Sequence, residues 1–109
     1  MADRALEVII ENATDEKVPT RARLIGSLDT TTVEEAQGEL TKAVETLAGN
    51  EIVFDFVDLK YISSAGLRVM LLVNKKATDK KIELKLVNLR PEVKDVFDMV
   101  GFTRLFVIE

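Results

Sequence analysis

The chain has 109 residues, 47% of them hydrophobic and 31% charged, and its 15 basic and 19 acidic side chains give a formal net charge of −4. This length is near the commonest domain size, so we expect one domain spanning residues 1–109. The chain has neither Cys nor His, which excludes disulfides, Cys/His zinc sites and thiol or histidine catalysis.

Two further classes of partner are not expected. The acidic balance argues against direct nucleic-acid binding, and no apolar run approaches the ~18 residues of a membrane span. Residues 1–4 lack the basic start and apolar core of a signal peptide. We therefore expect a cytoplasmic protein that uses no metal and no cofactor.

The chain opens with two predicted strands. Apolar residues alternate over residues 6–10, and again over 20–28, where Arg21 and Arg23 occupy the opposite face. Residues 12–19 form a polar turn, so the two strands are expected to pair as a hairpin.

A helix is predicted next. The threonines of the run 30–32 precede Glu34 and Glu35 in two overlapping Thr-x-x-Glu capping boxes. An amphipathic stripe follows at steps of three and four residues. Its members are Val33, Ala36, Leu40, Val44 and Leu47. Gly49-Asn50 provides a C-terminal stop.

The second half alternates strands and helices. Residues 52–57 are nearly continuously apolar, as in a central strand. Residues 67–73 are apolar almost all round, which predicts a heavily buried helix, with 75–81 as its polar exit. A fourth strand is expected over 82–86.

A third helix and a last strand complete the chain. The helix starts at Pro91 and is closed by Gly101, and the short strand covers residues 105–108. The residues expected to point inward from this helix are Val93, Val96, Phe97 and Val100. The order β-β-α-β-α-β-α-β predicts an α/β fold: a mixed β-sheet with an antiparallel edge and helices packed on it.

The segment Asp58–Arg68 places two hydroxyls and a glycine where a buried strand passes into an apolar helix. A helix start offers free N–H groups and the positive end of a dipole, which favour anionic groups. A serine there can be a plain N-cap, or a residue whose phosphorylation is locally tolerated and changes what the surface binds. The local sequence leaves both interpretations open.

Three segments of the chain resemble those of a STAS domain, specifically a small bacterial anti-sigma factor antagonist. Gly26-Ser27-Leu28-Asp29 is similar to the Gly-x-Leu-Asp turn before the first helix of that family. The motif within 58–67 resembles its phosphorylation loop, and Val96-Phe97 with Gly101-Phe102 resembles its C-terminal helix. The order of elements agrees over essentially the whole chain.

The resemblance implies a phosphorylation switch. In that family the unphosphorylated antagonist binds an anti-sigma factor, which is also a serine kinase, and releases the sigma factor. Phosphorylation of a serine two residues before the glycine ends this binding, and a phosphatase, expected to be of PP2C type, resets it. Counting back from Gly66 assigns this role to Ser64, with Ser63 as the alternative.

The resemblance also implies a partner-binding surface around that serine. Its expected members are Asp29, Asp58, Ser63, Ala65, Gly66 and Arg68. Asp29 and Asp58 are the acidic groups expected to flank Ser64, although the first could be a helix-entry residue and the second a turn former. Asp55, inside an apolar strand, is expected near the strand end or against a polar partner. Met70, Phe97 and Phe102 are expected in the core.

Two other functions fit the sequence less well. An aspartyl-phosphate receiver would use Asp55, but Glu11-Asn12 is a poor substitute for the acidic pair that holds Mg²⁺ in such domains. A STAS scaffold, or an accessory subunit of a signalling assembly or membrane transporter, is the stronger alternative, since a fold does not determine its partner. We do not expect an enzyme, because no nucleophile with a base and no Walker-type loop is evident.

Overall fold

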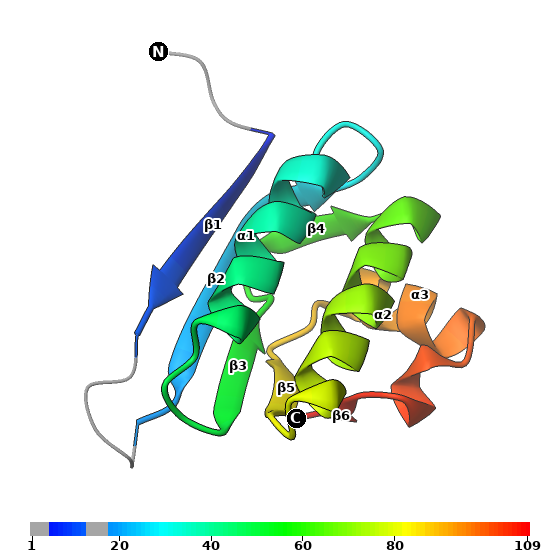
Figure 1. Ribbon diagram of the computed structural model, residues 1–109. Helices are drawn as coiled ribbons and strands as arrows, with labels where there is room; N and C mark the ends of the chain where they lie inside the picture. The colour runs from blue at the N-terminus through cyan, green and yellow to red at the C-terminus, as the bar shows by residue number, and fades with distance from the viewer. Residues whose placement is uncertain (1–4, 13–17) are drawn as a thin grey trace.

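A computed structural model describes residues 5–12 and 18–109 (Figure 1). Residues 1–4, where no signal peptide is expected, lie outside the described residues. Most of the polar turn predicted over 12–19 lies outside them too. The elements follow the chain as β1 (Leu6–Glu11), β2 (Thr20–Leu28), α1 (Val33–Glu45), β3 (Glu51–Asp55), β4 (Leu59–Ile62), α2 (Ser64–Asp79), β5 (Glu83–Val87), α3 (Pro91–Met99), the 3-10 helix η1 (Phe102–Arg104) and β6 (Val107–Ile108).

The strands of the described chain form one six-stranded mixed sheet in the order β1-β2-β3-β5-β6. β1 pairs antiparallel with β2, which confirms the hairpin at one edge, and the other pairs are parallel. β4 lies off this path and pairs with the C-terminal part of β2, beyond the residues that β3 occupies. The predicted mixed sheet is thus confirmed.

β4 is a strand that the sequence patterns did not predict. β3 and β4 are separated by the three residues Phe56–Asp58, and both strands pair in parallel with β2. The register shifts at Gly26, whose φ is +116° and whose N–H donates to the Asp58 carbonyl over 3.0 Å. A glycine accepts this conformation without a Cβ clash, so the bulge lets β2 pair with both strands and carries β4 to the start of α2.

α1 and α2 lie side by side on one face of the sheet (Figure 1). The alternation in β2 explains this placement: Ala22 and Leu24 are fully buried, whereas Arg21 and Arg23 are half-buried on the other face. The largest buried side chains include Phe54, Phe56, Phe97, Leu24 and Met70. The predicted core positions of Met70 and Phe97 are confirmed, and Phe102 packs against this core.

The first helix begins and ends differently from the prediction. Thr32 is the N-cap of α1, but its side chain makes no capping bond. Its hydroxyl instead donates to the Ser27 carbonyl and accepts from the Asp29 N–H, each over 2.9 Å, so the Thr-x-x-Glu prediction is wrong. α1 ends at Glu45 rather than near Gly49, and the C-cap Thr46 donates its hydroxyl to the Lys42 carbonyl over 2.8 Å.

The other two helices correct two burial predictions. α2 extends through the predicted polar exit to Asp79, and it is not buried on all sides: Leu71 and Leu72 are 39% and 47% exposed. Only one stripe of a helix can face a sheet. Val100, expected inward, is 50% exposed because it is the C-cap beyond the last turn of α3. Gly101 follows with a φ of +76°, in agreement with its predicted role as the stop.

Candidate functional site at the start of helix α2

Ser63 joins β4 to α2 and serves as the N-cap of the helix. Its backbone is extended, and its Oγ accepts from the Gly66 N–H over 3.2 Å. Its own N–H donates to the Leu28 carbonyl over 2.9 Å. The start of α2 is therefore fastened to the end of β2 through one residue.

Ser64 is the first residue of α2 and is exposed, whereas Ser63 is half-buried. Among residues 5–12 and 18–109, nothing hydrogen-bonds the Ser64 hydroxyl. Its amide lies in the first turn, where an α-helix provides no acceptor for the N–H. The two neighbouring serines thus differ in chemistry: one hydroxyl is used inside the molecule and the other faces solvent.

Gly66 is buried and has a reason within the molecule to be glycine. A Cβ there would lie 2.6 Å from the Leu28 carbonyl oxygen and 2.8 Å from Cγ1 of Ile62. Ala65, beside it, is half-buried. Close packing of α2 on the ends of β2 and β4 accounts for the glycine, while the contact with a partner that we expected at Ala65 and Gly66 stays a prediction.

Asp29 lies at the same edge of the sheet as the two serines. It directly follows Leu28, which pairs in register with Ile62, the residue before Ser63. Its Oδ1 accepts from the Thr31 hydroxyl over 2.7 Å and from the Thr31 N–H over 2.9 Å. These bonds lower the pKa of Asp29 below its ordinary value, so a fixed negative charge borders the start of α2.

Asp58 lies at the other end of β4. The four residues of β4 separate it from Ser63, and five residue steps of ~3.3 Å give a span of roughly 17 Å between the two Cα atoms. Its Oδ2 accepts from Nη2 of Arg23 over 3.1 Å. The structure therefore brings Asp29 to the serine pair and holds Asp58 away from it, while a role of either residue in partner binding stays a prediction.

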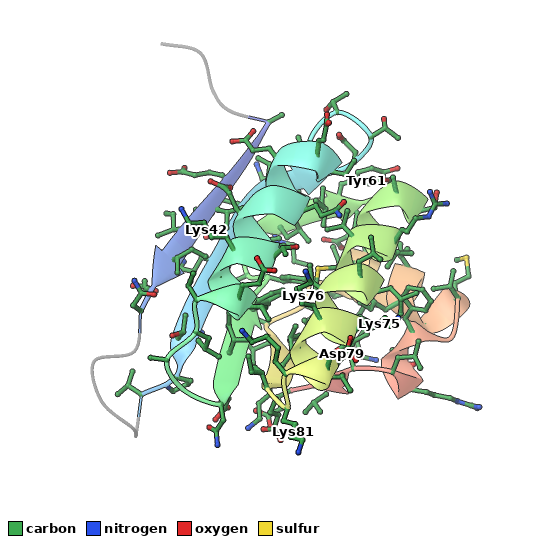
Figure 2. All side chains as sticks on the ribbon, viewed as in Figure 1. Lys42, Tyr61, Lys75, Lys76, Asp79 and Lys81 are labelled. Atoms are coloured by element: carbon green, nitrogen blue, oxygen red, sulfur yellow. The ribbon has the colours of Figure 1, made fainter. Side chains whose placement is uncertain are left out.

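Arg68 is exposed one helical turn after Ser64. Residues at i and i+4 of a helix are neighbours on its surface, so the guanidinium can reach toward a group carried on Ser64. Tyr61 is a site neighbour that we did not predict. It is 54% exposed on β4, and Figure 2 shows it at the end of the molecule where α1 and α2 begin. The chain has a single tyrosine, and its position two residues before the serines is the signal that could have identified it.

Asp55 lies apart from this site and has a structural role. It is the last residue of β3, only 6% exposed, and its Oδ2 accepts from Nη2 of Arg21 over 2.8 Å. Its Oδ1 accepts from the Val57 N–H and the Asn88 amide. Burial raises the pKa of Asp55, but these bonds and the Arg21 charge outweigh it and hold the pKa below its ordinary value. The expected polar partner is confirmed.

Neither a membrane-crossing helix nor a cluster of metal-binding side chains is found within the described residues. None of the described helices has the length and hydropathy that crossing a bilayer requires. Within residues 5–12 and 18–109, no three acidic side chains lie close enough together to hold a metal ion.

Comparison with known proteins supports the resemblance seen in the sequence. The Bordetella bronchiseptica protein BtrV, named provisionally as an anti-sigma factor antagonist, is 39% identical over 87 residues, which cover 80% of this chain and 74% of BtrV. The anti-sigma factor antagonist SpoIIAA in its unphosphorylated form superposes with a TM-score of 0.76 and 24% identity, covering 94% of this chain and 88% of SpoIIAA. Phosphorylated SpoIIAA from Bacillus gives a TM-score of 0.69 and 23% identity, covering 94% of this chain and 91% of that one.

The two solved structures show that the fold is shared, and the sequence matches show the family. The family model of the STAS domain matches residues 10–109, nearly the whole chain. Together with the identity to BtrV, this match shows that the chain belongs to the STAS domain family, as a homologue of anti-sigma factor antagonists.

Proposed function

We propose that this protein is an anti-sigma factor antagonist controlled by phosphorylation of Ser64. The unphosphorylated form binds an anti-sigma factor and releases the sigma factor. The anti-sigma factor is also the serine kinase that modifies Ser64, and a PP2C-type phosphatase restores the binding form. The chain acts in the cytoplasm as a substrate and binding partner, and does not itself catalyse a reaction.

The observation that carries this proposal is the difference between the two serines. The Ser64 hydroxyl is exposed on the first turn of α2, whereas the Ser63 hydroxyl caps the same helix. A kinase can reach Ser64 without dismantling the cap. Modification of Ser63 would instead require the kinase to reach a half-buried hydroxyl whose oxygen already accepts from the Gly66 N–H. The existence of SpoIIAA structures in both unphosphorylated and phosphorylated forms supports a switch of this kind in a protein with the same fold.

A phosphate on Ser64 is compatible with the fold. It adds about −1.5 to −2 charges and three strong acceptors. The first-turn amides of α2 and the positive end of its dipole favour that charge, and Arg68 lies one turn away on the same surface. Asp29 opposes it with its own negative charge. We therefore expect the modified chain to stay folded, and the main effect to fall on a partner docked over the start of α2.

Three matched variants test the proposal by calorimetric titration with the cognate anti-sigma factor. Ser64→Ala is expected to bind as tightly as the unmodified protein and to stay bound when ATP is added. Ser64→Glu is expected to bind at least about tenfold more weakly, since it places a charge in the interface. Ser63→Ala keeps the target serine, so ATP should still release it.

Two results would contradict the proposal. If ATP releases Ser64→Ala but not Ser63→Ala, then Ser63 is the target. If no form binds the anti-sigma factor, the partner is of another kind, and co-purification with a membrane permease would then support the accessory-subunit alternative.

A further inference from the structure

The outward side of α1 carries an unexplained glycine between two opposite charges. Glu34, Gly38 and Lys42 are all exposed and are spaced by four residues, so they lie along one side of the helix. We call these three residues the α1 ridge. Together with Gln37, Thr41 and Glu45 they line a shallow, open depression on the surface. Figure 2 shows Lys42 on α1, on the side away from α2.

Gly38 has no reason within the described chain to be glycine. It lies in the middle of a regular helix, its φ is not positive, and a Cβ there would meet nothing within 4 Å. Glycine weakens a helix interior relative to alanine. Gly66 differs from it, since a Cβ there would collide with Leu28. The bare backbone at Gly38 is therefore what close approach by a second chain would require.

The charges of the α1 ridge are complementary to those of a second copy. In an antiparallel pair of α1 helices with the twofold axis at Gly38, residue 34 of each copy faces residue 42 of the other. Two Glu34–Lys42 pairs then form symmetrically on either side of the crossing. Neither side chain has an ion-pair partner among the described residues of its own chain, so both are available.

The geometry of helix packing allows this arrangement. Each charge is four residues from the crossing, ~6 Å at 1.5 Å per residue. At a crossing angle of ~20°, the two helices diverge by only about 2 Å over that distance, whereas at ~50° they diverge by about 5 Å. The shallow crossing keeps both pairs within reach, and glycine at the centre lets the axes approach closely.

From these features we infer that a second copy of this chain docks on the α1 ridge, giving an antiparallel dimer that crosses at Gly38. The contact is polar and covers little more than one helix face, well below the ~1,600 Å² of a standard interface, so association is weak, reversible and reduced by salt. The helix dipole alone explains glutamate in the first turn and lysine in the last, but it gives no reason for glycine between them. The inference is independent of the phosphorylation switch.

Charge-swap variants of the full chain test the dimer in sedimentation equilibrium at low salt. Glu34→Lys and Lys42→Glu each place like charges opposite one another at both ends, and each is expected to dimerise at least about tenfold more weakly than the wild type. An equal mixture of the two variants restores opposite charges at both positions. The mixture is therefore expected to form a heterodimer about as strong as the wild-type dimer.

Gly38→Ala separates docking from folding. The added methyl is expected to raise the melting temperature of the monomer, because alanine is the better helix former, and yet to weaken dimerisation at the crossing. Gln37→Ala, next to it on the flank of the helix, adds no atoms at the crossing and should leave dimerisation within about twofold of the wild type.

A wild-type chain that stays monomeric even at about millimolar concentration would overturn the inference. So would a mixture of the two charge-swap variants that associates no better than either variant alone.

Discussion

The same substitution, glycine to alanine, should have opposite effects at two helical positions of this chain. At Gly66 the new Cβ would lie 2.6 Å from a backbone oxygen, 2.8 Å from Cγ1 of Ile62 and 2.9 Å from Cγ of Leu28. At Gly38 it would meet nothing within 4 Å. The pair therefore separates the intrinsic helix preference of alanine from the steric cost of adding a methyl group.

The expected magnitudes follow from these contacts. Overpacking costs about 1–3 kcal/mol, and the value at Gly66 should be in the upper part of that range because a backbone oxygen cannot rotate away. That oxygen also accepts the Ser63 N–H, so moving it strains the join between β4 and α2. Helix preference returns at most ~1 kcal/mol. We expect Gly66→Ala to lower the free energy of unfolding by about 1–2 kcal/mol, and Gly38→Ala to raise it by about 0.4–1 kcal/mol.

Urea unfolding at low protein concentration, together with thermal melts, measures both effects. For a domain of this size 1 kcal/mol shifts the melting temperature by roughly 5 °C, so Gly66→Ala should melt about 5–10 °C below the wild type. A Gly66→Ala variant as stable as the wild type, or a Gly38→Ala variant that is clearly destabilised, would contradict the expected contrast between the two glycines.

Three further predictions concern side chains with defined partners. Asp55→Asn should lose about 1–2 kcal/mol at pH 7, a figure discounted because Arg21 is 40% exposed. Because the folded pKa of Asp55 is lowered, the stabilisation from its charge is present above the unfolded pKa of ~3.9 and disappears as the pH falls through the folded pKa. Urea unfolding in acid should therefore show a smaller difference in stability between variant and wild type. A difference that stays constant with pH would refute this. Ser63→Ala should cost ~1 kcal/mol through loss of the N-cap, while Ser64→Ala should stay within about 0.5 kcal/mol, and equal losses in thermal melts would contradict the assignment of the cap. Lys85→Met should destabilise the chain, because three carboxylates within 4 Å lose their shared cation. Salt screens such charges, so the drop in melting temperature should be smaller in high salt. An equal drop at low and high salt would contradict an electrostatic cause.

Most of the fold follows from hydrophobic periodicity, and β4 does not because it lacks that signal. Lys60 and Tyr61 are both exposed, so Leu59–Ile62 shows no alternation, and only two of its four residues are buried. What makes it a strand is its pairing with the end of β2 beyond the bulge at Gly26. Such pairing depends on a residue more than thirty positions away and cannot be read from the local sequence.

The candidate site could be predicted only in part, because some of it also depends on contacts between residues far apart in the sequence. The start of α2 at the serine pair could be placed from the strand, the Ser-Ser-Ala-Gly run and the apolar helix. The separation of Asp29 from Asp58 could not be predicted, because it depends on β4, which holds Asp58 at its far end. Likewise, Thr32 was predicted as a side-chain cap from its spacing to Glu35, but its hydroxyl is bonded to Ser27 and Asp29, where tertiary placement outweighs local preference.

The Ser64 switch is tested most directly by locating the phosphate after the cognate kinase and ATP have acted on the wild-type chain, and again after phosphatase treatment. Mass spectrometry of the peptide that contains residues 58–68 resolves the two serines by fragmentation. We predict a single phosphate on Ser64, no phosphate on Ser63, and complete removal by a PP2C-type phosphatase. A phosphate on Ser63, on another residue, or on none would contradict this prediction.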